Sequence, residues 1–90
     1  MTRFHAIVSG LVQGVNFRHY AAMEAKALAL DGFVRNLPDG SVEVVAQGMK
    51  EDLLKLAEWL KLGPSSSRVE NVSIEWQPER EKFNGFSVKY

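Results

Sequence analysis

The 90-residue chain contains no cysteine and has no surplus of charge of either sign. Without cysteine the protein cannot form disulfides, use a thiolate nucleophile, or bind zinc or an iron–sulfur cluster through thiolates. Eleven Lys and Arg balance eleven Asp and Glu, so the chain lacks the positive excess that is typical of a duplex-binding module. We therefore expect no nucleic-acid partner, although a balanced charge still permits one local anion site.

Long apolar runs are also missing. The sequence has no stretch close to the ~20 apolar residues that a bilayer span requires. Its start leads to His5 and Ser9 rather than to the apolar core of an export signal. We therefore expect a cytoplasmic protein that has no membrane partner. We also expect it to be a monomer. With 46% apolar and 24% charged residues, the composition is globular, and the length predicts a single domain over residues 1–90.

Glycines and prolines divide the chain into strand-like and helix-like segments. β-rich or alternating patterns predict strands over Phe4–Ser9, Phe33–Leu37, Ser41–Gln47, Val72–Trp76 and Phe86–Tyr90. Strong helix formers predict helices over His19–Leu30 and about Met49–Leu62. This β-α-β-β-α-β order with a further strand predicts an α+β fold, the ferredoxin-like split βαβ sandwich, in which two helices cover one face of an antiparallel sheet.

Apolar spacing predicts which face each helix buries. In the first helix these residues are Tyr20, Met23, Ala27 and Leu30; in the second they are Leu53, Leu56, Ala57 and Leu60. Asp31-Gly32 is expected to end the first helix, because glycine adopts the left-handed conformation that often follows a helix. A mixed charge run, Glu79–Lys82, is expected to form a solvated turn.

The glycine-rich segment Gly10–Arg18 is a candidate anion site. A turn from a strand into a helix can direct successive backbone N–H groups into one concavity, and the helix N-terminus adds partial positive charge. The guanidinium of Arg18 can pair bidentately with a phosphate. The segment matches neither a Walker loop nor a dinucleotide fingerprint. From these residues alone, a plain strand-to-helix turn with a solvated arginine is the favoured alternative.

Asn36 lies near the end of a predicted strand, where a β-branched or apolar residue would be favoured. Its amide could serve a site, or it could merely cap the turn Pro38-Asp39-Gly40, which composition alone favours. Arg35 is expected to point to the opposite face and to be a surface charge.

Together the two segments resemble the signatures of the acylphosphatase family. The first signature, Gly-x-Val-Gln-Gly-Val-x-Phe-Arg, is matched by Gly10, Val12, Gln13, Gly14, Val15, Phe17 and Arg18. The second, Gly-aromatic-Val-basic-Asn followed by Gly, Val and a later Gly, is matched by Gly32, Phe33, Val34, Arg35, Asn36, Gly40, Val42 and Gly48. Both motifs are long, and the distance between them along the chain is similar to that in the family. The resemblance therefore favours an anion site at Gly10–Arg18 over a plain turn.

The resemblance implies hydrolysis of small-molecule acyl phosphates to a carboxylate and inorganic phosphate, without a metal or organic cofactor. It implies that Arg18 binds the phosphoryl group together with backbone N–H groups of Gln13, Gly14, Val15, Asn16, Phe17 and Arg18. It also implies that Asn36 orients the attacking water. Inorganic phosphate is then both product and competitive inhibitor. The sequence departs from the family pattern at Leu11, Ala29 and Phe33, where a basic residue, a glycine and a tryptophan are common.

The residues suit this chemistry independently of the family. Neither motif contains a general base. The amide of Asn36 cannot act as one near neutral pH. An acyl phosphate expels a carboxylate whose conjugate acid has a pKa of about 4, so it needs no general acid. His5 and His19 are too isolated to suggest a metal site.

Two alternatives remain open at this stage. RNA-recognition domains share the split βαβ plan, but the segment 84–90 lacks their aromatic motif. A regulatory domain that has kept the anion site without turnover is disfavoured by Arg18 and Asn36.

Overall fold

The computed structural model describes residues 1–79 and 82–90, so Arg80 and Glu81 of the predicted solvated turn lie outside the described residues. The described residues form five strands and two helices. Their order and bounds are β1 Thr2–Leu11, α1 Phe17–Ala27, β2 Asp31–Asn36, β3 Val42–Gly48, α2 Lys50–Leu62, β4 Arg68–Pro78 and β5 Phe86–Lys89. Among the described residues, no helix is both long and apolar enough to cross a membrane.

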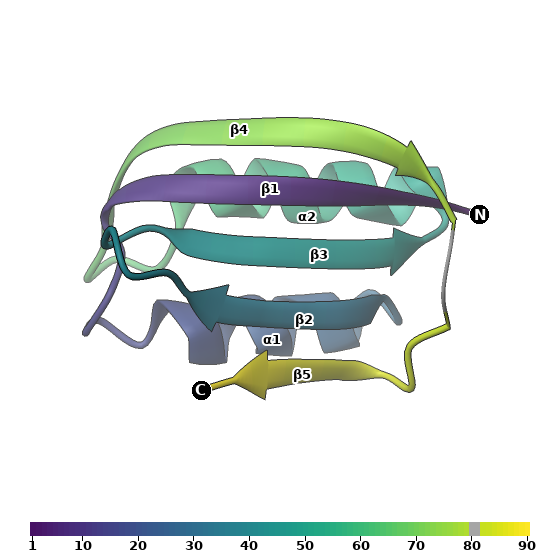
Figure 1. The fold of residues 1–90 in the computed structure, drawn as a ribbon, viewed down its shortest axis with the longest axis horizontal. Helices are drawn as coiled ribbons and strands as arrows, with labels where there is room; N and C mark the ends of the chain where they lie inside the picture. Colours follow the sequence, from purple (N-terminus) through teal and green to yellow (C-terminus); the bar gives the residue numbers. More distant parts are fainter. Residues whose placement is uncertain (80–81) are drawn as a thin grey trace.

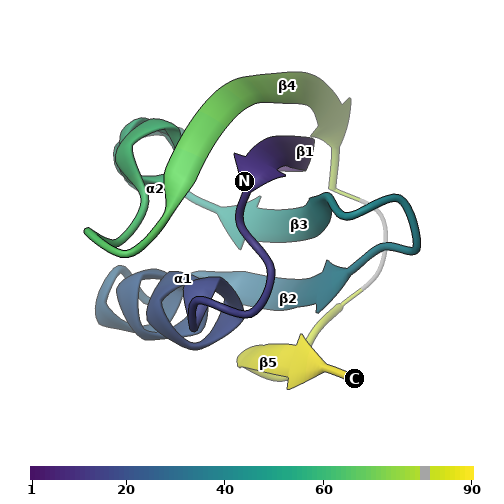
Figure 2. The same cartoon turned by 90° about the vertical axis from the view of Figure 1, so that its left-hand side faces the viewer.

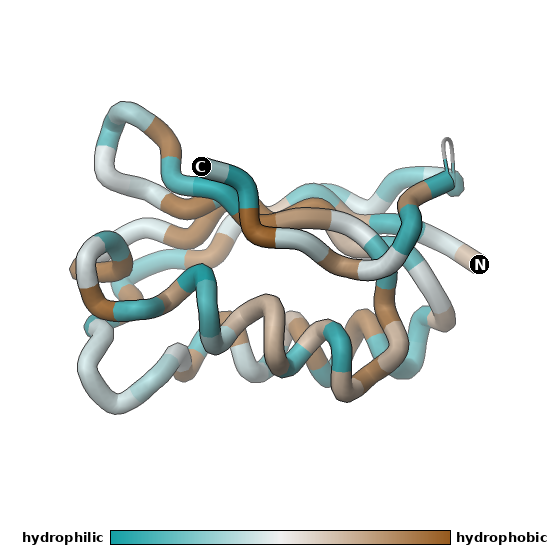
Figure 3. The backbone as a smooth tube through the Cα atoms, turned by 90° about the horizontal axis from the view of Figure 1, so that it is seen from below, coloured by the Kyte–Doolittle hydropathy of each residue, from teal (hydrophilic) through white to brown (hydrophobic). Residues whose placement is uncertain are grey.

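The strands form one sheet in the order β4-β1-β3-β2-β5, with both helices packed on the same face (Figures 1 and 2). Figure 3 shows the helices as a separate layer on one side of the sheet. The ferredoxin-like α+β fold is therefore confirmed. The expected antiparallel pairing holds for the first four strands, whereas β5 pairs with β2 in parallel, so the sheet is mixed. β4 and β5 form the two opposite edges of the sheet, and β5 runs in the same direction as β2 (Figure 1).

Strand alternation assigns each side chain to one face of the sheet. Phe4, Ala6 and Val8 of β1 lie beside Ala46, Val44 and Val42 of β3 and are completely buried under the helices. The opposite face carries polar and charged side chains, including Arg35, which is exposed as expected. Because β2 follows the same alternation, Asn36 shares the helix-covered face with Val34. The alternation therefore directs the Asn36 side chain to the side of the sheet on which α1 lies.

The predicted buried face of α2 is confirmed at all four positions. The predicted buried face of α1 is wrong at Tyr20, Met23 and Ala27, which are exposed, whereas Leu30 is buried but lies after the end of the helix. The helix instead buries Phe17, Ala21, Ala22 and Ala25. Alanine side chains are small, so a helix that presents them can lie close to a sheet. The larger side chains have the same helical spacing, so the sequence pattern did not show which of the two faces is buried.

The end of α1 also differs from the prediction. The helix ends at Ala27, and Asp31-Gly32 begins β2. The left-handed residue after the helix is Ala29, with φ 56°. The Leu30 N–H donates to the Ala25 carbonyl at 2.9 Å, and the Ala29 N–H donates to the Lys26 carbonyl at 3.0 Å. This is the Schellman pattern, here built on an alanine where glycine is usual.

Candidate active site

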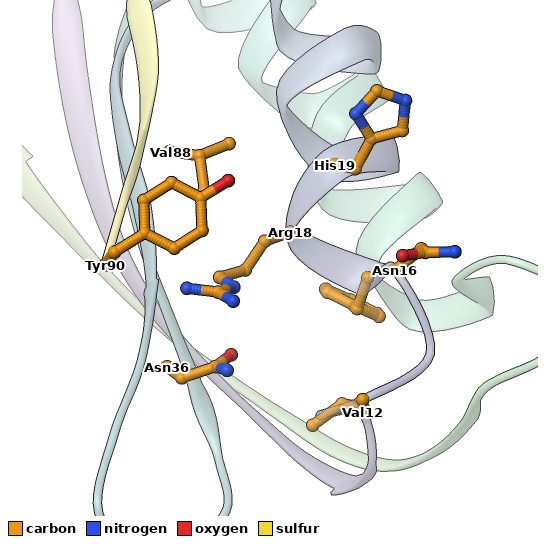
Figure 4. Close-up of a pocket in the computed structure, with 9 residues that line it drawn as sticks. Val12, Asn16, Arg18, His19, Asn36, Val88 and Tyr90 are labelled. Carbon is orange, nitrogen blue, oxygen red and sulfur yellow. The ribbon is translucent and has the colours of Figure 1, made fainter.

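The predicted anion segment lies next to the end of the β2–β3 hairpin. β1 extends to Leu11 and α1 begins at Phe17, so Arg18 is in the first turn of the helix. A pocket of about 200 Å³ opens there. It is lined by Val12, Gly14, Asn16, Phe17, Arg18, His19, Asn36, Val88 and Tyr90 (Figure 4). Both predicted catalytic residues, Arg18 and Asn36, therefore line the same pocket.

We call residues Gln13–Arg18 the cradle loop. Gly14 and Asn16 have φ values of 76° and 62°, so left-handed residues alternate with ordinary ones along the loop. The backbone N–H groups of residues 15–19 make no hydrogen bond to any described residue. The first intrahelical bond is from the Tyr20 N–H to the Asn16 carbonyl at 3.1 Å. Free N–H groups at a helix N-terminus form a site suited to an anion.

Four residues of the cradle loop line the pocket, whereas Gln13 and Val15 do not. Among the predicted phosphate-binding residues, Gly14, Asn16, Phe17 and Arg18 therefore face the cavity with part of their surface. The Val15 carbonyl accepts a hydrogen bond from the Ser66 hydroxyl at 3.1 Å. The Gln13 side chain points to the β2–β3 hairpin instead.

The half-buried Arg18 side chain lies between the C-terminal strand and Asn36 (Figure 4). One terminal nitrogen (Nη1) donates to the Lys89 carbonyl at 3.0 Å, and the guanidinium carbon lies 4.6 Å from the centroid of the Tyr90 ring. No carboxylate among the described residues pairs with this guanidinium. Its positive charge therefore remains available to an anion in the pocket.

Asn36 contributes a polar atom that has no partner within the described part of the chain. Its Oδ1 is buried and accepts no hydrogen bond. A buried amide oxygen without a partner costs free energy, about 1–3 kcal/mol, unless a water or ligand donates to it. The Asn36 amide and the Arg18 guanidinium point toward one another across the pocket (Figure 4). The pair can thus hold a donor such as water next to an anion.

The turn that follows Asn36 is closed by its own hydrogen bonds. The Leu37 N–H donates to the Ser41 carbonyl at 2.8 Å, and the Gly40 N–H donates to the Leu37 carbonyl at 3.1 Å. The Ser41 hydroxyl and N–H both donate to the Asp39 carboxylate and lower the pKa of Asp39. Asp39 thus serves the turn, and Asn36 does not cap it.

The two histidines are separated by the sheet. His5 lies on the helix-free face, where its Nε2 is 2.7 Å from a carboxylate oxygen of Glu43. His19 is exposed at the rim of the pocket. Within residues 1–79 and 82–90, no three His, Asp or Glu side chains group to hold a metal ion.

Sequence reasoning missed the pocket wall contributed by Val88 and Tyr90 of the C-terminal segment. Their alternation with Ser87 and Lys89 signals a strand, but no local signal says that this strand pairs with β2. The hydrogen bonds from the Gln13 side chain to the Leu37 and Ser41 carbonyls were also missed, although Gln13 belongs to the first signature.

Comparison with known proteins gives consistent results. The family model described as acylphosphatase matches residues 4–88. The chain is 48% identical over 88 residues to an acylphosphatase from Thermus thermophilus, which covers 98% of this chain and 99% of the relative. It is 43% identical over 88 residues to an acylphosphatase from Roseiflexus, with 98% and 95% covered. The crystal structure of acylphosphatase from Bacillus subtilis superimposes with a TM-score of 0.97 at 38% identity, with 100% of each chain covered.

Proposed function

This chain belongs to the acylphosphatase family, and from that premise we propose that it hydrolyses acyl phosphates to a carboxylate and inorganic phosphate without a metal ion. In this proposal Arg18 and the cradle loop bind the phosphoryl group, and Asn36 orients the attacking water. The observation that supports it most directly is that Arg18, Asn36 and the free N–H groups at the start of α1 meet at one pocket.

The phosphoryl group binds where positive charge and N–H donors converge. Its equatorial oxygens accept hydrogen bonds from the free N–H groups of the cradle loop, and the planar guanidinium of Arg18 pairs with two of them. Phosphoryl transfer passes through a loose transition state, so positioning and stabilisation of these oxygens supply most of the catalysis. A site that is already arranged avoids reorganisation during the reaction.

The water binds to the Asn36 amide, whose unpartnered Oδ1 accepts a hydrogen bond from it. Its oxygen attacks phosphorus in line with the bond to the acyl oxygen. The new P–O bond forms as the old one breaks, and the carboxylate leaves with the bonding electrons. The water's proton passes to a phosphoryl oxygen, because the amide of Asn36 cannot take it.

The leaving group explains how so few residues suffice. A carboxylate is stable without protonation, since its acid has a pKa of about 4. An alkoxide would require a general acid, and Arg18 and Asn36 cannot act as one. The proposal therefore restricts the enzyme to activated phosphates and assigns no step to a metal.

The test measures phosphate release by the purified protein from acetyl phosphate and benzoyl phosphate, with glycerol phosphate as the unactivated comparison. We expect turnover of both acyl phosphates in excess chelator, almost none of glycerol phosphate, and competitive inhibition by inorganic phosphate. Loss of activity in chelator that a divalent ion restores would overturn the metal-free mechanism. Absence of turnover on either acyl phosphate would overturn the proposed function.

A further inference from the structure

The Gln13 side chain connects the cradle loop to the hairpin that carries Asn36. Its Nε2 donates to the Leu37 carbonyl at 2.8 Å and to the Ser41 carbonyl at 2.8 Å. Leu37 follows Asn36 along the chain, and Ser41 precedes Val42, the partner of Asn36 in the sheet register. The two acceptors therefore bracket the strand pair that holds Asn36.

The orientation of this amide follows from its partners. Only the nitrogen end of a glutamine amide has two donors, and carbonyl oxygens can only accept. An amide turned the other way would place its own oxygen against two carbonyls. Gln13 thus uses both of its side-chain N–H donors on the hairpin, and it does not line the pocket.

These bonds are not needed to close the turn. The turn already has the bonds between Leu37 and Ser41, between Gly40 and Leu37, and between Ser41 and Asp39. Gln13 adds a bridge between segments far apart in sequence. One segment supplies the phosphate donors and the other supplies Asn36, so the bridge sets the distance between them.

We propose that the Gln13 side chain is a positioning residue, which holds Asn36 at the distance from the cradle loop at which its water can attack the bound phosphoryl group. This inference rests on the proposed function. Gln13 acts through Asn36 and does not touch the substrate with its side chain. Small displacements matter in such a site, since a shift of about 1 Å can reduce the rate by about a hundredfold.

The test compares the variants Gln13→Met, Asn36→Ala and the double variant with the wild-type protein, using acetyl phosphate turnover and inhibition by inorganic phosphate. Methionine keeps the length of the side chain and removes both donors. Gln77→Met is the matched control, because Gln77 lies on β4 and, among residues 1–79 and 82–90, its side chain donates only to Glu75, at 2.7 Å. Circular dichroism and thermal unfolding first establish that each variant folds.

We expect Gln13→Met to lower kcat by about 10- to 100-fold while the phosphate inhibition constant changes less than about twofold. In the Asn36→Ala background the same substitution should produce no further loss, since its effect passes through Asn36. Gln77→Met should keep wild-type kcat. A Gln13→Glu variant, which places a carboxylate against the two carbonyls, should be impaired at least as strongly as Gln13→Met.

Three results would overturn the inference. They are an unchanged kcat in folded Gln13→Met, an equal loss of kcat in the Asn36→Ala background, or a loss of phosphate affinity that matches the loss of kcat. If Gln13→Met does not fold, Gln13→Glu takes its place in the same comparison. Failure of the proposed function is distinguishable, because the wild-type protein itself would then release no phosphate from acetyl phosphate.

Discussion

The guanidinium of Arg18 lies against the ring of Tyr90, with 4.6 Å between the guanidinium carbon and the ring centroid. Tyr90 is itself fully exposed, and the contact covers one face of the guanidinium at the rim of the pocket. With the bond from Arg18 to the Lys89 carbonyl, it restricts the rotamers of a long side chain before any anion binds. We therefore expect the C-terminal segment to orient Arg18 at the pocket.

Replacing Tyr90 should weaken phosphate binding modestly. A cation–π contact at an exposed site contributes about 0.5–1 kcal/mol, so Tyr90→Ala should raise the phosphate inhibition constant about two- to fivefold. Tyr90→Phe keeps the ring and should behave like the wild-type protein. Equal phosphate inhibition constants for the wild-type protein, Tyr90→Ala and Tyr90→Phe would show that the ring does not orient Arg18.

Arg18→Ala should weaken phosphate binding and abolish most turnover. A hydrogen bond to a charged group contributes about 1.5–3 kcal/mol and a bidentate pair more, so the loss of affinity should be at least about tenfold. Arg18→Lys should not restore activity, because a single ammonium cannot reproduce the planar fork of the guanidinium. Inhibition by phosphate and steady-state kinetics measure both effects; near-native turnover in Arg18→Lys would argue for a simple charge at this position.

Asn36→Ala should separate catalysis from binding. Because Asn36 is proposed to hold only the water, kcat should fall by about two to three orders of magnitude, whereas phosphate affinity should stay nearly constant. Circular dichroism must confirm the fold of the variant. The division of roles fails if folded Asn36→Ala keeps its kcat, or if it loses phosphate binding as severely as Arg18→Ala.

Ala29→Gly should stabilise the fold. Alanine at φ 56° carries strain of about 1–2 kcal/mol, which glycine avoids at an unfolded-state entropy cost of about 0.4–1 kcal/mol. The expected net gain is about 0.5–1 kcal/mol, or a Tm several degrees higher for a domain of this size. Ala27→Gly is the matched control, since Ala27 is exposed within α1 and glycine there should destabilise. A lower Tm for Ala29→Gly would contradict the strain argument.

Acid should remove the contribution of Glu43 to stability. Burial raises the pKa of Glu43, but hydrogen bonds from His5 and Arg35 on the helix-free face outweigh it and lower the pKa below the ordinary value of 4.5. A carboxyl whose pKa is lowered on folding stabilises the protein fully above its unfolded pKa, and this contribution is lost as pH falls through the lowered value. Denaturant unfolding measured as a function of pH should therefore show that the free energy of unfolding decreases less in acid for Glu43→Gln than for the wild-type protein. Parallel curves for the two proteins would exclude this role.

The sequence alone was sufficient for the order of elements and for the buried face of α2. It was also sufficient for the opposite orientations of Arg35 and Asn36, because helix and strand periodicity are local properties. It failed for the buried face of α1, since two stripes have helical spacing and only packing against the sheet selects the alanines. The helix ended early because hydrogen bonding in the Schellman motif permits a left-handed Ala29, which the sequence does not signal.

The candidate site, too, was predicted from the sequence in part, and the rest of it is visible only in the tertiary structure. Its residue types follow from two motifs, and the resemblance of these motifs to those of a family is sufficient to predict Arg18 and Asn36 as site residues. Only the tertiary structure could show that β5 pairs in parallel with β2, which brings Tyr90 to Arg18, and that Gln13 reaches across to the hairpin of Asn36. These contacts join segments that are distant in the chain. They depend on how the whole sheet is assembled, and no local pattern of residues encodes them.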